Sequence, residues 1–269
     1  MIRWIIILIC VLLVWCSTEP VMAQEVQTQN FSKAQIKQLN KLRREAFTAT
    51  QKGNFPQAED YWTQLIELLP ENPVGWSNRG NSRVSQNKLE AAIADFTQAV
   101  ELAPEAADPY LNRGTAYEGQ QRWEKAIADY QRVLELNPKD GMAYNNLGNA
   151  LAGMGKWEEA IANYQTSVKL TPTLAFPRAN YALALYQIGK QQEAIRTMRN
   201  LVRKYPQFPD VRAALTAALW EEGKLGEAES NWVAVVGLDK RYQDLDWVSN
   251  VRRWPPLMVH ALEKFLKLN

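Results

Sequence analysis

The sequence predicts an all-α chain built as a solenoid of stacked helix pairs, and three features that recur at one fixed interval predict it. A small residue returns through most of the chain as Ala58, Ala92, Ala126, Ala160, Ala194 and Ala228. A proline returns as Pro70, Pro104, Pro138, Pro172 and Pro206, and a glycine as Gly80, Gly114 and Gly148. The interval of about 34 residues is the length of a helix–turn–helix unit that stacks on its neighbours.

The most regular unit runs from Tyr144 to Pro172. An aromatic residue, a Leu-Gly pair, an alanine and a second aromatic residue follow one another as Tyr144, Leu147, Gly148, Ala160 and Tyr164. This pattern resembles the tetratricopeptide repeat (TPR), and the resemblance extends over about residues 39 to 242. It implies a right-handed α-solenoid of six TPR helix pairs with a C-terminal capping helix. Because this repeat serves many unrelated partners, it leaves the function open.

The repeat pattern divides the chain into a leader, an array and a tail. We expect a signal peptide over residues 1–23, a flexible leader over 24–31, the array over 32–242 and a capping segment over 243–269. The six repeats cover about residues 39–72, 73–106, 107–140, 141–174, 175–208 and 209–242. Ser32 and Gln35 fit a capping box, so the first helix should begin at Lys33 and end near Lys52.

The recurring small residues predict close contact between the two helices of each pair. Gly148 and Ala160 let the helices approach, and Tyr164 fills the wider space beside them. A glycine inside a helix costs about 1 kcal/mol relative to alanine, so tight packing must compensate for it. Repeat five departs from the pattern, with Arg178 at the aromatic position and Ala182 in place of glycine.

Repeat five is also the most basic part of the array. It carries Lys190, Arg196, Arg199, Arg203 and Lys204 against one acidic residue, Glu193. Two interpretations remain open for this run, a solvated helix face and a docking patch for an acidic partner.

The tail after Tyr242 predicts a capping helix. Two arginines, Trp254 and two prolines lead into a helix on which one face holds Met258, Leu262, Phe265 and Leu266. Such a helix would cover the apolar face of the last repeat. The Arg-Trp-Pro-Pro stretch followed by this helix resembles the tail of TPR proteins from cyanobacteria and the chloroplast thylakoid lumen, a family with no established chemistry.

The N-terminus predicts export across a membrane, to the periplasm or the thylakoid lumen. Arg3 precedes an apolar run from Trp4 to Trp15, and Val21-Met22-Ala23 fits a signal peptidase site, so cleavage should follow Ala23. The alternative is an uncleaved N-terminal membrane anchor, although the run is short for a spanning helix, which needs about 20 apolar residues. A third reading, lipidation of Cys16, is disfavoured by the bulky residue that precedes it. Both cysteines, Cys10 and Cys16, lie in this segment.

Charge and composition argue against several classes of function. The formal net charge is +2, with 31 basic and 29 acidic residues, which favours neither nucleic acid nor a membrane surface as partner. We expect no catalytic site, cofactor or metal, because His260 is the only histidine and no phosphate loop or nucleophile motif occurs. An enzyme with an unrecognised carboxylate site is the remote alternative. Glu158-Glu159 has a simpler explanation, since acids stabilise a helix N-terminus.

The TPR resemblance implies that the first helix of each repeat lines a concave groove that binds peptides. Ten positions carried over from the family form the predicted site: Asn78, Asn81, Asn112, Thr115, Asn145, Asn146, Asn149, Asn180, Leu183 and Tyr186. The same positions also include Arg43, Arg44, Phe47, Ser77, Val84, Leu111, Glu118, Met142, Phe176, Asp210 and Trp220. Asparagine both donates and accepts, so it suits the backbone of an extended peptide. It can equally bind a neighbouring helix.

These observations predict a non-catalytic protein-interaction adaptor or scaffold, and the most specific form of this expectation is assembly of a membrane-associated complex. The partner would be a protein or peptide, and contact with a membrane would come only through the signal, the anchor or that partner. The alternative is a scaffold that self-associates through an aromatic surface with Trp247 and Trp254. The chaperone-type carboxylate clamp of some TPR proteins is disfavoured, because Phe47, Asp108 and Asn112 stand where it needs basic residues.

Overall fold

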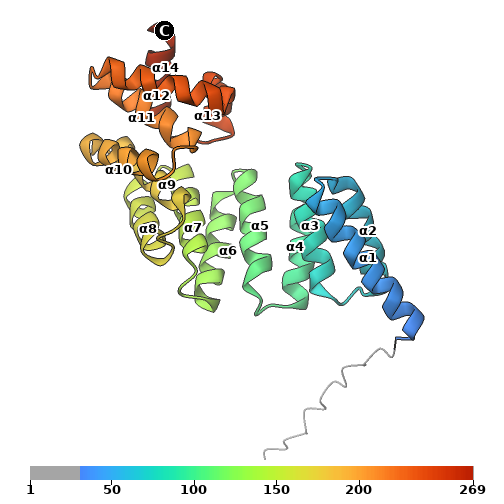
Figure 1. The fold of residues 1–269 in the computed structure, drawn as a ribbon. Helices are drawn as coiled ribbons and strands as arrows, with labels where there is room; N and C mark the ends of the chain where they lie inside the picture. The colour runs from blue at the N-terminus through green and yellow to red at the C-terminus, as the bar shows by residue number, and fades with distance from the viewer. Residues whose placement is uncertain (1–30, 269) are drawn as a thin grey trace, which may run out of the picture.

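The computed structural model describes residues 31–268, and this part of the chain folds into α-helices with no strand (Figure 1). The prediction of an all-α solenoid is therefore confirmed. The predicted signal peptide, the alternative anchor, both cysteines and all but the last residue of the predicted leader lie outside the described residues. Among the helices described, none is long and apolar enough to cross a membrane.

Twelve helices form six successive pairs. The pairs are α1 (Lys33–Gln51) with α2 (Phe55–Leu68), α3 (Pro73–Ser85) with α4 (Leu89–Leu102), α5 (Ala107–Gly119) with α6 (Trp123–Leu136), α7 (Gly141–Gly153) with α8 (Trp157–Leu170), α9 (Ala175–Gln187) with α10 (Gln191–Lys204), and α11 (Pro209–Glu221) with α12 (Leu225–Leu238). The odd-numbered members are called first helices below, and the even-numbered members second helices. The predicted capping box is present, with Ser32 Oγ accepting from the Gln35 N–H at 3.2 Å and Gln35 Oε1 accepting from the Ser32 N–H at 2.9 Å.

The turn inside every repeat contains one residue with a positive φ. Four repeats place glycine there, with φ between 71° and 80° at Gly53, Gly155, Gly189 and Gly223. Asn87 and Gln121 take the same place with a φ of 58°. A left-handed residue at this point closes the first helix, because the next N–H then bonds back to a carbonyl of the last turn, as Arg122 does to Tyr117 at 2.9 Å.

Replacing Gln121 by glycine should stabilise the protein by about 0.5–1 kcal/mol, because glycine adopts a positive φ without the steric cost that a Cβ adds. The expected result is a higher midpoint of thermal unfolding followed by circular dichroism. The matched control is Gly155→Gln, where an added Cβ meets no heavy atom within 4 Å and the backbone conformation alone is tested. That variant should unfold at a lower temperature, and a shift in the same direction for both variants would contradict the explanation.

Close approach of glycine to an aromatic ring joins the helices of repeats two, three and four. A Cβ built at Gly80, Gly114 or Gly148 would lie 2.6 Å from a ring carbon of Phe96, Tyr130 or Tyr164, respectively. No real Cβ tolerates that distance, so glycine is required by packing at these positions. The recurring alanines are fully buried on the second helices, with 0% exposure from Ala58 to Ala228.

In repeats two and three, a buried ion pair joins the first helix to the second helix of the same repeat. The sequence did not predict these pairs. The guanidinium of Arg79 binds both carboxylate oxygens of Asp95 at 2.8 and 3.0 Å, and Arg113 binds Asp129 at 2.7 and 2.9 Å. Each arginine also donates to a threonine of the preceding second helix, as Arg113 does to Thr97 at 3.2 Å. Later repeats lack these pairs, because Leu147, Tyr181 and Leu215 take the place of the arginine. One continuous apolar core extends from Ala126 to Phe265.

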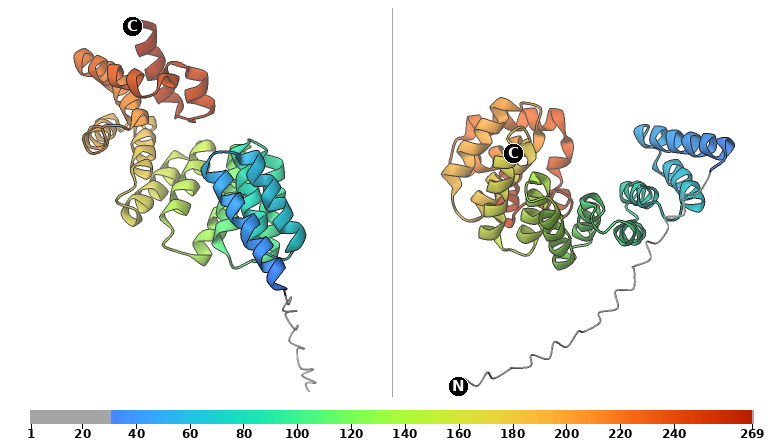
Figure 2. Two further views of the ribbon diagram at one scale, coloured as in Figure 1. Left: turned by 45° about the vertical axis from the view of Figure 1, so that its right-hand side comes forward. Right: turned by 90° about the horizontal axis from the view of Figure 1, so that it is seen from below.

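The first helices lie on the inner side of a curved array. Successive first helices contact one another, α3 with α5, α5 with α7 and α7 with α9, whereas neighbouring second helices stay farther apart. The views in Figure 2 show the curvature, which tightens toward the C-terminal repeats. In a curved stack the closer elements are on the concave side, so the first helices form the inner face as the TPR resemblance implies.

The tail packs onto this inner face rather than onto the second helix of the last repeat alone. It comprises η1 (Lys240–Gln243), α13 (Leu245–Asn250) and α14 (Pro256–Leu268), and α14 lies against the first helices α9 and α11. Met258, Leu262 and Phe265 are buried as predicted, and Leu266 is half-buried. The cap therefore covers the apolar surface of repeat six and also reaches back to repeat five.

Candidate peptide-binding surface on the inner face

Exposure along the inner face decreases from the N-terminal to the C-terminal repeats. One position in successive repeats holds Asn81, Thr115, Asn149 and Leu183, of which the first two are exposed, the third is half-buried and Leu183 is 7% exposed. One turn further along repeat five, Tyr186 is 3% exposed. Because α14 packs against α9, the predicted site residues of repeat five are covered by the chain itself.

Four predicted asparagines form a hydrogen-bond network between α7 and α9. Asn180 Nδ2 donates to the side-chain oxygens of Asn145 and Asn149, each at 3.0 Å, and Asn145 donates to Asn146 at 3.0 Å. Tyr164 also donates to Asn149, at 3.0 Å. Asn145 is only 4% exposed. These side chains join neighbouring repeats. For them, the alternative that asparagine binds a neighbouring helix is the one that the structure shows.

The asparagines of α3 and α5 have a different environment. Asn78 is half-buried and donates to the Val74 carbonyl of its own helix at 2.8 Å. The side-chain amides of Asn81 and Asn112 form no hydrogen bond to another described residue, and both face partly or fully into solvent. At the inner-face positions carried over from the family, three large apolar side chains are also exposed: Phe47 at 45%, Met142 at 40% and Phe176 at 57%. The inner face thus presents at least one exposed or half-buried side chain in each of the first four repeats, as Phe47, Asn81, Asn112 and Met142.

A buried carboxylate at the start of α11 anchors the tail. Asp210 is 2% exposed, and its Oδ1 accepts from Tyr242 Oη at 2.7 Å, Trp254 Nε1 at 2.9 Å and Arg252 Nε at 3.0 Å. Arg252 also pairs with Asp210 Oδ2 at 2.9 Å. Burial, followed by the nearby charge of Asp210, raises the pKa of the Tyr242 hydroxyl, which therefore stays a donor. Asp210, which lies on a first helix, therefore binds the tail of its own chain.

The segment between α13 and α14 extends the contact to repeat three. Arg253 Nη1 lies 3.0 Å from Glu118 Oε1, and the guanidinium stands 5.8 Å from the centre of the Trp123 ring. Tyr130 also donates to Glu118, at 3.0 Å. Burial raises the pKa of the Glu118 carboxyl, and the charge of Arg253 and the Tyr130 hydrogen bond oppose that shift. In repeat five, Gln187 Oε1 accepts from the Leu257 N–H at 2.9 Å.

The sequence reading missed Gln187, Arg252 and Arg253 as tail anchors. The available signal was a pair of arginines directly before a tryptophan in a segment that otherwise reads as an apolar cap. Their partners are distant in sequence, so no local pattern connects them. The predicted aromatic surface for self-association is also wrong in part, because Trp254 is 4% exposed and Trp247 packs against Tyr242.

Comparison with known proteins decides the family. A family model described as tetratricopeptide repeat matches residues 45–107, 77–141 and 111–175, and a second model of that description matches residues 180–207. Together these spans cover more than half of the chain. The chain belongs to the tetratricopeptide repeat family. No curated protein matches it.

Solved TPR structures share the fold. A TPR protein from Parabacteroides merdae is 19% identical with a TM-score of 0.65, over 86% of this chain and 86% of that chain. MamA from Desulfovibrio magneticus is 17% identical with a TM-score of 0.56, over 61% and 93%. YrrB, described as a TPR protein with an unusual peptide-binding site, is 20% identical with a TM-score of 0.52, over 76% and 97%. At these identities the likeness shows the TPR fold alone.

Carboxylates elsewhere in the TPR array have structural roles. Among the described residues, no cluster of three or more His, Cys, Asp or Glu side chains could hold a metal ion. Glu221 at the end of α11 pairs with Lys264 at 2.8 Å, and Glu222 pairs with Lys224 at 2.6 Å. Glu158 and Glu159 occupy the first turn of α8, where they complement the helix dipole.

Replacing Asp210 by asparagine should release the tail of the TPR array. The loss of charge leaves Arg252 without an ion-pair partner. We expect a cost of about 2 kcal/mol, less than for a fully buried pair, because the Arg252 side chain is 31% exposed. Tryptic cleavage after Arg252 or Arg253, quantified by mass spectrometry, should accelerate about thirtyfold, because local opening limits proteolysis. The control is Asp239→Asn in the same segment, whose partner Arg241 is mostly exposed. That change should alter the rate less than about fivefold, and equal rates in both variants would contradict the anchoring role.

Proposed function

We propose that this TPR protein is a non-catalytic interaction adaptor that binds an extended polypeptide segment along the inner face of its first four repeats. The observation that carries the proposal is the position of the tail. Residues 251–255, which have no regular helix, and the first turn of α14 lie along the inner face. They are held by side chains of three first helices, Glu118, Gln187 and Asp210. This face therefore already holds one segment of polypeptide.

The accessible part of the face offers suitable chemistry for a second segment. The amides of Asn81 and Asn112 each present a donor and an acceptor, so they can bind a peptide backbone whatever its side chains. Phe47 and Met142 offer apolar contact nearby on the same series of helices. A partner with an extended backbone and apolar side chains fits this combination.

Replacing Asn81 and Asn112 together by alanine should weaken partner binding about thirtyfold, since each lost hydrogen bond contributes about 1 kcal/mol. The full chain is used as bait on cross-linked extracts of its native cells, and each recovered protein is quantified by mass spectrometry. The decisive readout is a protein that the unsubstituted chain recovers and the double variant loses.

The matched control is Asn137→Ala with Asn163→Ala, which removes two amides from α8 and from the end of α6. Neither position is on a first helix, so recovery of the same partner should be unchanged. If the two double variants recover equal amounts, the inner face is not the binding surface. Thermal unfolding of both variants shows whether the change is one of binding or of stability.

Export is the second part of the proposal, and assembly of a membrane-associated complex in the periplasm or thylakoid lumen is its most specific form. Its support is the apolar run from Trp4 to Trp15 followed by Val21-Met22-Ala23. N-terminal sequencing of the protein from its native cells should give Gln24 as the first residue. A chain that retains the apolar run in a membrane fraction would instead support the anchor, and one that retains it in the cytosol would contradict export.

A further inference from the structure

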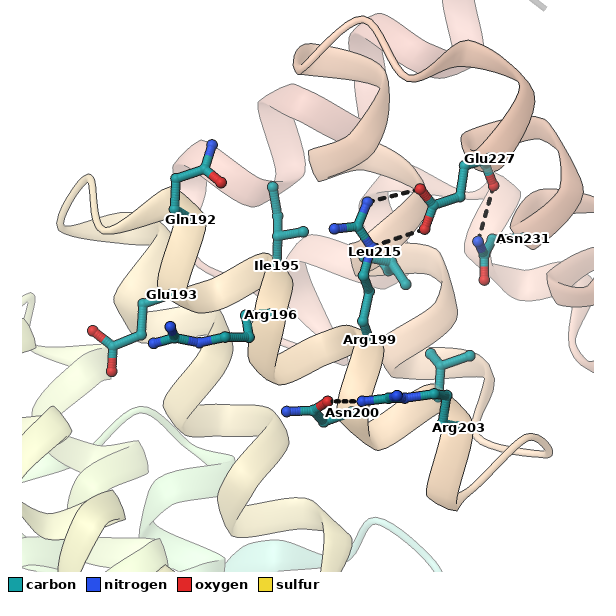
Figure 3. Close-up of a pocket in the computed structure, with 11 residues that line it drawn as sticks. Gln192, Glu193, Ile195, Arg196, Arg199, Asn200, Arg203, Leu215, Glu227 and Asn231 are labelled. Atoms are coloured by element: carbon teal, nitrogen blue, oxygen red, sulfur yellow. Dashed lines mark hydrogen bonds and ion pairs between the residues drawn. The ribbon is translucent and has the colours of Figure 1, made fainter.

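A pocket opens on the outer side of the array between the second helices of repeats five and six (Figure 3). It has a volume of about 790 Å³. On one side α10 contributes Arg196, Arg199 and Arg203. On the opposite side α12 contributes Glu227 and Asn231. Leu215 of α11 lies at its base. This pocket is separate from the inner face.

The three arginines follow the helical spacing of three and four residues, so they share one face of α10. The middle one already binds a carboxylate. Arg199 donates from Nε and Nη2 to the two oxygens of Glu227 at 2.9 and 2.7 Å, across the pocket. These hydrogen bonds lower the pKa of the Glu227 carboxyl and keep it ionised. The Arg199–Glu227 pair thus shows that a carboxylate fits against the arginines of this pocket.

The two outer arginines have no such partner. Within residues 31–268, neither Arg196 nor Arg203 forms an ion pair, and Arg203 donates only to the neutral Asn200. Glu193, one helical turn before Arg196, accepts a hydrogen bond from Tyr181 at 2.8 Å. Seven residues separate the two outer arginines, which is two helical turns or about 10.5 Å. Two unpaired guanidinium groups therefore flank a carboxylate-binding one.

We propose that this pocket binds an acidic segment of a partner protein, with two carboxylates about 10 Å apart placed on Arg196 and Arg203. Guanidinium groups bind carboxylates with two parallel hydrogen bonds, which gives such a contact its specificity. The amides of Asn200, Asn231 and Gln192 line the same hollow but bind within the chain, to Arg203, to Arg212 and the Glu227 carbonyl, and to Glu222, respectively. The guanidinium groups of Arg196 and Arg203 therefore carry the contact with the peptide. No aromatic side chain lines it, so it lacks the stacking surface with which proteins hold single-stranded nucleic acid.

The test is fluorescence anisotropy with the full chain and a short labelled peptide in which glutamate alternates with leucine and serine. A second peptide carries glutamine in place of every glutamate. The glutamate peptide should bind and the glutamine peptide should not. Arg196→Gln with Arg203→Gln should weaken binding about tenfold, as expected for two partly exposed arginine–carboxylate pairs.

Two control variants locate the site. Lys139→Gln with Lys169→Gln removes the same net charge from exposed positions of α8 and of the turn before α7, and it should leave the affinity unchanged. Asn81→Ala with Asn112→Ala alters only the inner face and should also leave it unchanged. An equal loss of affinity in either control would overturn the proposal, as would failure of the glutamate peptide to bind.

Two further measurements test the chemistry of the pocket. Glu227→Gln frees Arg199 for the ligand, so the glutamate peptide should bind several-fold more tightly, and an unchanged affinity would overturn the role of Arg199. A labelled single-stranded oligonucleotide of equal charge should bind more weakly than the peptide. If the oligonucleotide instead binds more tightly than the peptide, and the Arg196 and Arg203 double variant loses that binding, the ligand of the pocket is a nucleic acid and the proposal of an acidic protein segment is overturned.

Discussion

The close contact between a glycine of one helix and an aromatic ring of the next is the constraint on which the array depends. At Gly80, Gly114 and Gly148 there is no room for a Cβ beside the ring of Phe96, Tyr130 or Tyr164. This contact sets the distance between paired helices, and the recurring buried alanines maintain it along the second helices. Once each pair has this spacing, stacking the pairs buries a continuous core and exposes a curved face of first helices.

Two kinds of stabilisation divide the array. In repeats two and three, bidentate pairs between Arg79 and Asp95 and between Arg113 and Asp129 join neighbouring helices, and the inner face is open. In repeats five and six the core is apolar, and the tail covers the inner face through the buried carboxylate of Asp210. The two halves therefore have different surfaces available, the inner face in the first half and the outer pocket of α10 in the second.

The periodic part of the fold was predictable because its contacts are local. The capping box of α1, the fourteen-residue second helices and the turn in each repeat follow from residues close in sequence. The ten predicted site residues all lie on first helices, and peptide binding by them stays a prediction. Asn180, Asn145 and Asn149 bind one another, and Leu183 and Tyr186 are buried, because neighbouring helices and the tail occupy the space that a peptide was expected to fill.

The sequence by itself determined the helix pairs, their order and the face on which each residue lies, since the repeat interval encodes contacts within a pair and between neighbours. The tertiary structure alone decided where the tail lies. Arg253 meets Glu118 across a separation of 135 residues, and Trp254 meets Asp210 across 44. No period in the sequence specifies such pairs, because they depend on the accumulated curvature of the stack. That curvature brings the end of the chain back onto its own inner face.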